Sequence, residues 1–146
     1  MKRNLIKVTA AALLLVSVGA CKKDSNTSSK SKTQLLTQSA WKTVNQEFGN
    51  GTNWAQNPDW SSKEACEKDD LLILKANMTY EETEGASKCD PSDPQVTDNG
   101  TWAWQENETK LVIDGVVGTV IQLDENTFQV TSQINSTMSI RVTYAH

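Results

Sequence analysis

The sequence is poor in the side chains that carry most metal-binding and acid–base chemistry. Its 146 residues include one histidine, His146, and three cysteines. A structural zinc site needs more thiols or imidazoles than these, and a terminal imidazole is a poor candidate for a positioned general base. The sequence also lacks a Gly-rich phosphate loop, a Gly-x-Ser-x-Gly motif and a metal-binding histidine pair. We therefore expect no catalytic residue, no resident metal and no cofactor.

Positive charge is scarce beyond the N-terminal region. Residues 35–146 contain 7 basic and 17 acidic residues, which gives a net charge of −10. Such an acidic segment is disfavoured as a nucleic-acid-binding domain. Residues 22–34 differ, because they contain four lysines, one aspartate and no apolar side chain. This composition predicts a solvated tether that is not part of a folded core.

Long apolar runs are also lacking, and the most apolar segment, Val8–Val18, lies near the N-terminus. It is shorter than the ~20 residues that a membrane-spanning helix needs. Basic residues precede it and Gly19-Ala20-Cys21 follow it, which is the layout of a secretory signal peptide. The segment resembles a bacterial lipoprotein signal, with Val18 where leucine is more common. This resemblance implies removal of residues 1–20 and diacylation of Cys21, and an ordinary cleavage site near Cys21 is the alternative.

An acylated Cys21 would attach the protein to a lipid bilayer, since two or three acyl chains hold a protein durably. We expect a lipid-anchored protein of the cell envelope, in the outer membrane. An aspartate directly after the acylated cysteine would favour retention in the inner membrane, and this sequence has Lys22 there instead. The sequence does not predict which side of the outer membrane the protein faces. The chain then divides into a signal peptide at 1–20, a lipidated flexible tether at 21–34 and one domain at 35–146, which we expect to be monomeric.

The two remaining cysteines, Cys66 and Cys89, are a natural disulfide pair once Cys21 carries lipid. Residues that face each other across an antiparallel hairpin have residue numbers with a constant sum. The sum for Cys66 and Cys89 is 155, so a hairpin that pairs them is centred between Asn77 and Met78. Turn chemistry places the chain reversal at the same point. A disulfide at the open end of this hairpin would stabilise the domain by roughly 2–4 kcal/mol.

The domain is predicted to be all-β. Thr, Val and Ile are frequent, helical periodicity is scarce, and Asn, Asp and Gly separate the apolar runs. The short connections favour antiparallel neighbours. We predict eight strands, at Ala40–Phe48, Asp70–Lys75, Met78–Glu84, Gly100–Gln105, Lys110–Ile113, Val117–Leu123, Thr127–Ile134 and Thr137–Ala145.

Two connections are long, Gly49–Asp69 and Gly85–Asn99, and each contains one of the paired cysteines. Long connections in small domains are commonly lids or packed loops. In the first, the stretch Ser61–Glu64 is able to cap a short helix that runs toward Lys68. The disulfide would join both loops at one end of the domain, which we expect to be the open end of a barrel.

Several motifs resemble the lipocalin-like lipoproteins of diderm bacteria over nearly all of Leu35–His146. They are Ser39-Ala40-Trp41-Lys42, Cys66–Leu72, Asn77-Met78-Thr79-Tyr80, Glu84–Pro91 and Gly100-Thr101-Trp102. The resemblance implies an eight-stranded antiparallel up-and-down barrel with a small-molecule cavity. Ser39 and Met78 stand where that family usually has glycine.

Lipocalins also stack an arginine from the last strand on the first-strand tryptophan, which Arg141 would do with Trp41. However, strand alternation places Arg141 on the same face as Ser139 and Thr143, away from the apolar side chains of that strand. Both arrangements stay open at this point.

The candidate ligand-binding residues are aromatic: Trp54, Trp60, Trp104 and Tyr80. Trp54 and Trp60 lie in the first long connection, and packing of that loop over the barrel is the alternative for both. Acidic groups at Glu67/Asp69/Asp70 and Asp90/Asp93 have the oxygen ligands that calcium prefers, although surface acids more commonly serve solubility. Glu82 and Glu84 share a strand face but do not by themselves make an acid–base pair.

The sequence thus favours a membrane-anchored binding lipoprotein that holds a small apolar or amphipathic ligand in the barrel mouth. The alternative is a non-catalytic protein-interaction or envelope-structural lipoprotein whose barrel is filled with side chains.

Overall fold

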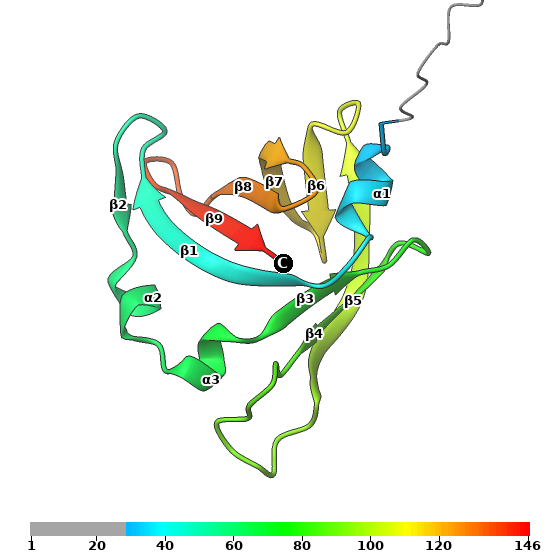
Figure 1. Ribbon diagram of the computed structural model, residues 1–146. Helices are drawn as coiled ribbons and strands as arrows, with labels where there is room; N and C mark the ends of the chain where they lie inside the picture. The colour runs from blue at the N-terminus through cyan, green and yellow to red at the C-terminus, as the bar shows by residue number, and fades with distance from the viewer. Residues whose placement is uncertain (1–28) are drawn as a thin grey trace, which may run out of the picture.

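The computed structural model describes residues 29–146 (Figure 1). The predicted signal peptide, the acylation site Cys21 and most of the predicted tether lie outside the described residues. These three assignments therefore stay predictions.

Strands dominate the described chain, and the helices are short. The strands are β1 (Trp41–Gly49), β2 (Trp54–Gln56), β3 (Leu71–Leu74), β4 (Thr79–Thr83), β5 (Val96–Gln105), β6 (Lys110–Ile113), β7 (Val116–Leu123), β8 (Thr127–Gln133) and β9 (Ser139–Ala145). The helices are α1 (Lys32–Leu36), α2 (Pro58–Ser62) and α3 (Ala65–Lys68).

The sheet closes into an eight-stranded antiparallel up-and-down barrel, which confirms the predicted all-β, lipocalin-like fold. From β3 onward each strand pairs with the next one along the chain, and β1 pairs with both β3 and β9. β2 pairs only with the end of β1 and extends the sheet outside the ring. All eight predicted strands are present, and β2 is the strand that the sequence did not predict.

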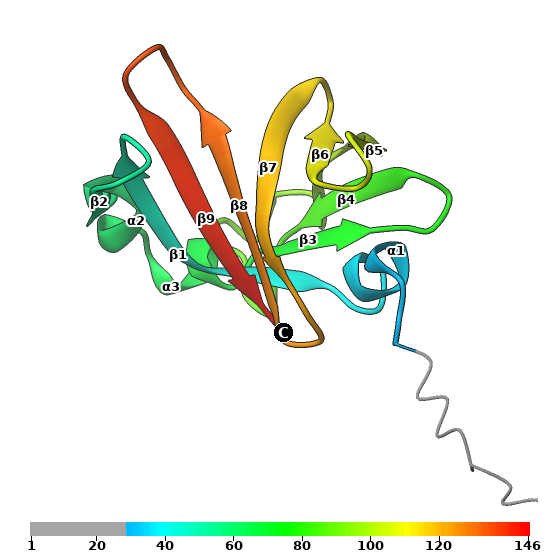
Figure 2. The ribbon, with the colours of Figure 1, turned by 90° about the horizontal axis from the view of Figure 1, so that it is seen from above.

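The antiparallel order gives the barrel two different ends. At one, called the closed end, lie α1, the β3–β4, β5–β6 and β7–β8 turns and the C-terminus. At the other, called the mouth, lie α2, α3, the β4–β5 loop (residues 84–95) and the β6–β7 and β8–β9 turns. Figure 2 shows the C-terminus beside the β7–β8 turn, with the β6–β7 and β8–β9 turns on the opposite side.

Helix α1 covers the closed end. The Ser31 hydroxyl accepts a hydrogen bond from the Gln34 backbone amide, and the Gln34 side chain bonds the Ser31 amide in return, so the helix starts with a capping box. Leu36 is fully buried in the barrel core. The folded part therefore begins inside the predicted tether 21–34, because the cap and this leucine outweigh the polar composition before them.

The core is densest near the closed end, around Trp41, which is completely buried. Its indole N–H donates to the Leu36 carbonyl at 2.8 Å, which ties α1 to the start of β1. The ring of His146 stacks on the Trp41 ring at a centroid distance of 3.8 Å, and Phe128 lies at 5.8 Å. His146, the histidine without an expected role, is thus part of this aromatic cluster.

Arg141 does not contact Trp41, so the arrangement implied by the resemblance is wrong and the strand alternation was right. Its guanidinium lies 4.4 Å from the ring centroid of Trp54 and forms a 2.7 Å ion pair with Glu47. Val142, the next residue, lines the barrel interior instead. Arg141 therefore belongs to the outer face.

The Cys66–Cys89 disulfide is present, with a Cα–Cα distance of 5.3 Å. The hairpin register differs by one from the expected value, because Leu71 pairs with Thr83 and the hairpin is centred on Asn77. The cysteines lie beyond this ladder, in α3 and in the β4–β5 loop. The pairing was predicted correctly, but the bond joins two loops at the mouth and does not follow the strand register.

The predicted short helix of the first long connection is found as two helices. Asn57 caps α2, and Glu64 caps α3 through a capping box with Glu67. The chain reaches Lys68 in helical form as expected, and Glu64, within the predicted capping stretch Ser61–Glu64, is the N-cap residue of α3.

Candidate functional site

The mouth of the barrel contains a cavity of about 200 Å³. The barrel interior forms one side of it and the α2–α3 segment forms the other, so polar and aromatic side chains from distant parts of the chain meet here. The cavity is lined by Thr43, Gln46, Trp60, Lys63, Glu67, Asp70, Leu71, Leu72, Glu82, Thr97 and Tyr144.

A second cavity of about 140 Å³ lies along the inner face of β6–β9. Apolar side chains dominate its walls, among them Leu111, Phe128, Val130 and Val142. Tyr144 lines both cavities. The two cavities therefore share one wall residue, and polar side chains dominate the first while apolar side chains dominate the second.

Strand pairing explains why a carboxylate faces the first cavity. Glu82 on β4 lies directly opposite Leu72 on β3, a buried core residue, and opposite Asp98 on β5. Directly opposed residues of neighbouring strands share one face of the sheet. Glu82 and Asp98 consequently point inward, where a packed barrel would have apolar residues.

The carboxylates in and beside this cavity are held in an unfavourable environment for their charge. The pKa of Glu82 is raised above its usual value by desolvation first, and then by the negative charges of Asp98 and Asp70. Desolvation likewise raises the pKa of Asp70. Neither Asp70 nor Glu82 forms an ion pair with a basic residue of the described chain, whereas Glu67 is paired with Lys63 at 3.1 Å.

Tyr144 was not among the predicted site residues. Burial, followed by the nearby charge of Glu82, raises its pKa to about 12, so its hydroxyl keeps its proton at neutral pH. That hydroxyl makes no hydrogen bond to any residue in the range 29–146. The sequence signal was available, because Tyr144 alternates with Val142 and Ile140 on the apolar face of the last strand.

Trp60 is the one predicted ligand-binding residue that lines a cavity. Its side chain is 8% exposed and forms part of the wall between α2 and the barrel. Trp54 lies on the outer face against Arg141, and Trp104 donates its indole N–H to the Thr33 hydroxyl near the closed end. Neither Trp54 nor Trp104 lines either of these cavities.

Tyr80, the fourth predicted residue, is buried in the core and lines neither cavity. Its hydroxyl lies 2.8 Å from Asp98 Oδ2 and 3.0 Å from Asp114 Oδ2. Desolvation and these two carboxylates raise its pKa well above the usual value. The single hydroxyl proton of Tyr80 is thus shared between Asp98 and Asp114.

The acidic residues that suggested calcium do not form a ligand cluster. Asp69 Oδ2 accepts hydrogen bonds from the Ser87 amide and hydroxyl, and Asp90 accepts similar bonds from Ser92. These bonds order the β4–β5 loop.

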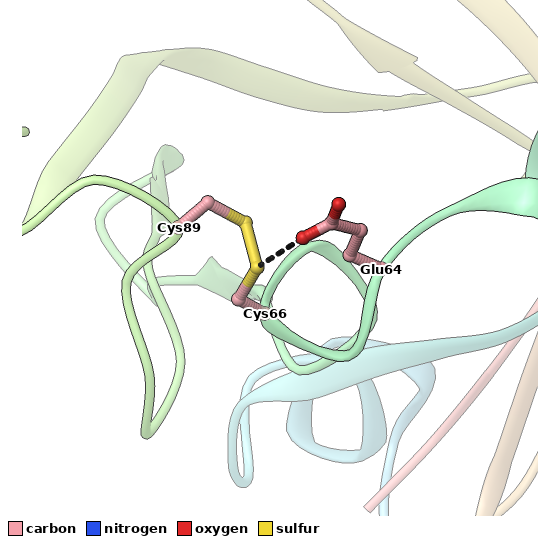
Figure 3. Close-up of side chains that lie close together, drawn as sticks. All are labelled: Glu64, Cys66 and Cys89. Carbon is pink, nitrogen blue, oxygen red and sulfur yellow. Dashed lines mark hydrogen bonds between the residues drawn. A yellow bond between two sulfur atoms is a disulfide. The ribbon is translucent and has the colours of Figure 1, made fainter.

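One group of potential metal ligands is found among residues 29–146, namely Glu64, Cys66 and Cys89 (Figure 3). Glu64 Oε2 lies 3.8 Å from Cys66 Sγ. Because the two sulfur atoms are bonded to each other, they cannot act as thiolate ligands. The group is a disulfide with a neighbouring carboxylate.

Glu82→Gln is expected to stabilise the protein at neutral pH. A carboxyl group with a raised pKa in the folded state stabilises it below the pKa of the unfolded chain, and this contribution is lost as the pH rises through the folded-state pKa. The glutamine side chain does not ionise, so the Glu82→Gln variant does not lose this stability as the pH rises. Because Glu82 is exposed to the cavity and its charge is screened by solvent, we expect a gain below about 1 kcal/mol at pH 7 and none at pH 4.

Thermal denaturation at both pH values measures this difference. Glu81→Gln is the matched control, because Glu81 is the neighbouring residue on β4 and is paired with Lys75. A gain at pH 4 equal to that at pH 7 would show that Glu82 affects stability by some means other than its charge.

Fold and site together define a small all-β barrel that is covered by a helix at one end and has an amphipathic cavity at the other. No family model matches the chain, and comparison with curated proteins finds no significant match. Within residues 29–146, the helices are all too short or too polar to cross a membrane.

Proposed function

We propose that this protein is a membrane-anchored binding lipoprotein that holds a small amphipathic ligand in the mouth of its barrel. The observation that carries this proposal is the pair of cavities, one polar and one apolar, that share Tyr144 as a wall residue. Eight-stranded barrels have an interior just wide enough for side chains or for one small ligand. Here side chains fill the closed end, and space remains at the mouth.

Membrane anchoring is the second half of the proposal and is supported by the N-terminal sequence. The basic residues, the short apolar run and the small residues before Cys21 have the order of a lipoprotein signal. Mass spectrometry of the mature N-terminus is expected to find an acylated Cys21. An unmodified thiol there would reject anchoring and leave the binding proposal intact.

Ligand binding is tested with the full-length protein in phosphatidylcholine nanodiscs, using tryptophan fluorescence and three probes with the same alkyl chain: n-hexylamine, n-hexanol and n-hexanoate. We expect at least one probe to change the fluorescence saturably, because Trp60 lines the cavity. The change should disappear in Trp60→Phe and persist in Trp54→Phe, whose ring lies on the outer face. If no probe produces a saturable change relative to empty nanodiscs, the envelope-structural alternative is favoured.

A further inference from the structure

The cavity at the mouth has an unbalanced negative charge. Of its carboxylates, Glu67 forms an ion pair with Lys63, whereas Asp70 and Glu82 form no ion pair in the described part of the chain. Asp98, which lies opposite Glu82, adds a third negative charge at the cavity edge. A concave site with an excess of one sign of charge concentrates counter-ions and repels ions of its own sign, and here the three lining carboxylates outnumber Lys63, the one basic lining residue. This surface therefore disfavours carboxylate and phosphate groups.

The same cavity has hydrogen-bonding groups that the protein itself does not use. Oδ1 of Asp70 is buried and has no partner within residues 29–146. The Tyr144 hydroxyl, on a side chain that lines both cavities, is likewise unpartnered in that range. Buried polar groups are normally hydrogen-bonded. The Asp70 oxygen lacks such a partner, and the Tyr144 hydroxyl adds a polar group at the cavity wall that the described residues do not use.

The walls also suit the apolar part of a cationic ligand. Aromatic rings attract ammonium groups, and Tyr144 is part of the wall. Trp60 is also part of the wall, but its ring already has Lys68 Nζ at 5.9 Å from the centroid. The apolar cavity, whose wall includes Tyr144, has a volume of about 140 Å³, which suits a short alkyl chain and not a long acyl chain. It also reaches Val116 beside the β6–β7 turn, so the charged surface and the apolar surface lie on different sides of the barrel interior and share Tyr144.

We propose that the mouth is selective for small amphipathic cations, with an ammonium group near Asp70, Glu82 and the Tyr144 hydroxyl and an alkyl chain in the apolar cavity. This selectivity rests on the proposed binding function and names its ligand class. It also gives a reason for the inward-facing carboxylates, which destabilise the empty barrel but are offset by a bound cation.

The three hexyl probes test this selectivity, because they share one chain and differ in head-group charge. In low-salt buffer at pH 7, we expect hexylammonium to bind at least tenfold more tightly than hexanoate, with hexanol between them. Loss of a charged hydrogen-bond partner should weaken hexylammonium binding about tenfold in Glu82→Gln. Hexanol binding should not change in this variant, which shows that the cavity is intact.

Glu81→Gln is the matched control, since it removes the same charge from the adjacent residue on the outer face of β4. Asp70→Asn is a second inward variant, with the same expected loss as Glu82→Gln. Equal weakening by Glu81→Gln would overturn the assignment of the cation to the cavity. If hexanol or hexanoate binds as tightly as hexylammonium, the cation selectivity is overturned and the binding function stands. If no probe binds, both are overturned.

Discussion

Replacing Trp41 with alanine is expected to lower the free energy of unfolding by about 4 kcal/mol, the largest effect of any substitution considered for this barrel. Trp41 is 0% exposed, and its ring packs between His146 and Phe128. Alanine would leave a cavity that the closed barrel cannot collapse to fill. It would also remove the hydrogen-bond donor of the Leu36 carbonyl, a contact that holds α1 over the closed end.

Urea denaturation of the wild type and two variants measures this effect. Trp54→Ala is the matched control, because Trp54 lies on the outer face and its contact with Arg141 is worth about 1 kcal/mol. Trp41→Phe keeps an aromatic ring but loses the N–H donor, and we expect an intermediate loss. A Trp41→Ala effect as small as that of Trp54→Ala would contradict the view that the closed end holds the main core.

The barrel itself could be predicted because its strands alternate and its turns are short. In the last strand, apolar Ile140, Val142 and Tyr144 alternate with polar residues, so the sequence alone predicts which face of this strand is buried. The reversal at Asp114-Gly115 is equally clear, since both residues adopt positive φ, at 44° and 83°. Local patterns of this kind determine strand position, and closure follows from the order of antiparallel neighbours.

The candidate site was harder to predict because its charged residues lie on the inner face of the barrel, at the solvent-exposed mouth. Glu82 alternates with Tyr80 on β4, and Tyr80 is buried, so the alternation does place Glu82 inward. Its charge argues for the opposite face, and only the pairing with Leu72 and Asp98 resolves the conflict. Long-range pairing of this kind is not visible in the sequence of β4 alone.

The different roles of Trp54 and Trp60 also could not be predicted from the local sequence. Trp54 and Trp60 lie in one loop and looked equivalent, yet β2 directs Trp54 toward Arg141 while α2 directs Trp60 toward the cavity. β2 has three residues, too few to show a period-two pattern. Its formation depends on pairing with the end of β1, which is tertiary information.

Replacing Cys66 and Cys89 together by serine is expected to lower the free energy of unfolding by about 3 kcal/mol, the cost of losing a cross-link across 23 residues. The loss should be concentrated at the mouth. Helix α3 has four residues and none of them is buried, so it has little apolar contact of its own. Apart from the disulfide, the hydrogen bonds from Ser87 to Asp69 hold the β4–β5 loop in place.

Hydrogen exchange separates this local effect from a global one. In the double variant, amides of residues 64–70 and 84–95 should lose protection, while those of β7, β8 and β9 keep most of theirs. Reduction of the disulfide in the wild-type protein should cause the same loss of protection. This experiment is the control for the double variant, because it breaks the cross-link without introducing serine hydroxyls. Because α3 and β3 contribute Glu67 and Leu71 to the polar cavity, hexylamine binding should weaken in parallel. Unchanged protection around α3 would show that packing and the Asp69–Ser87 bonds shape the mouth without the cross-link.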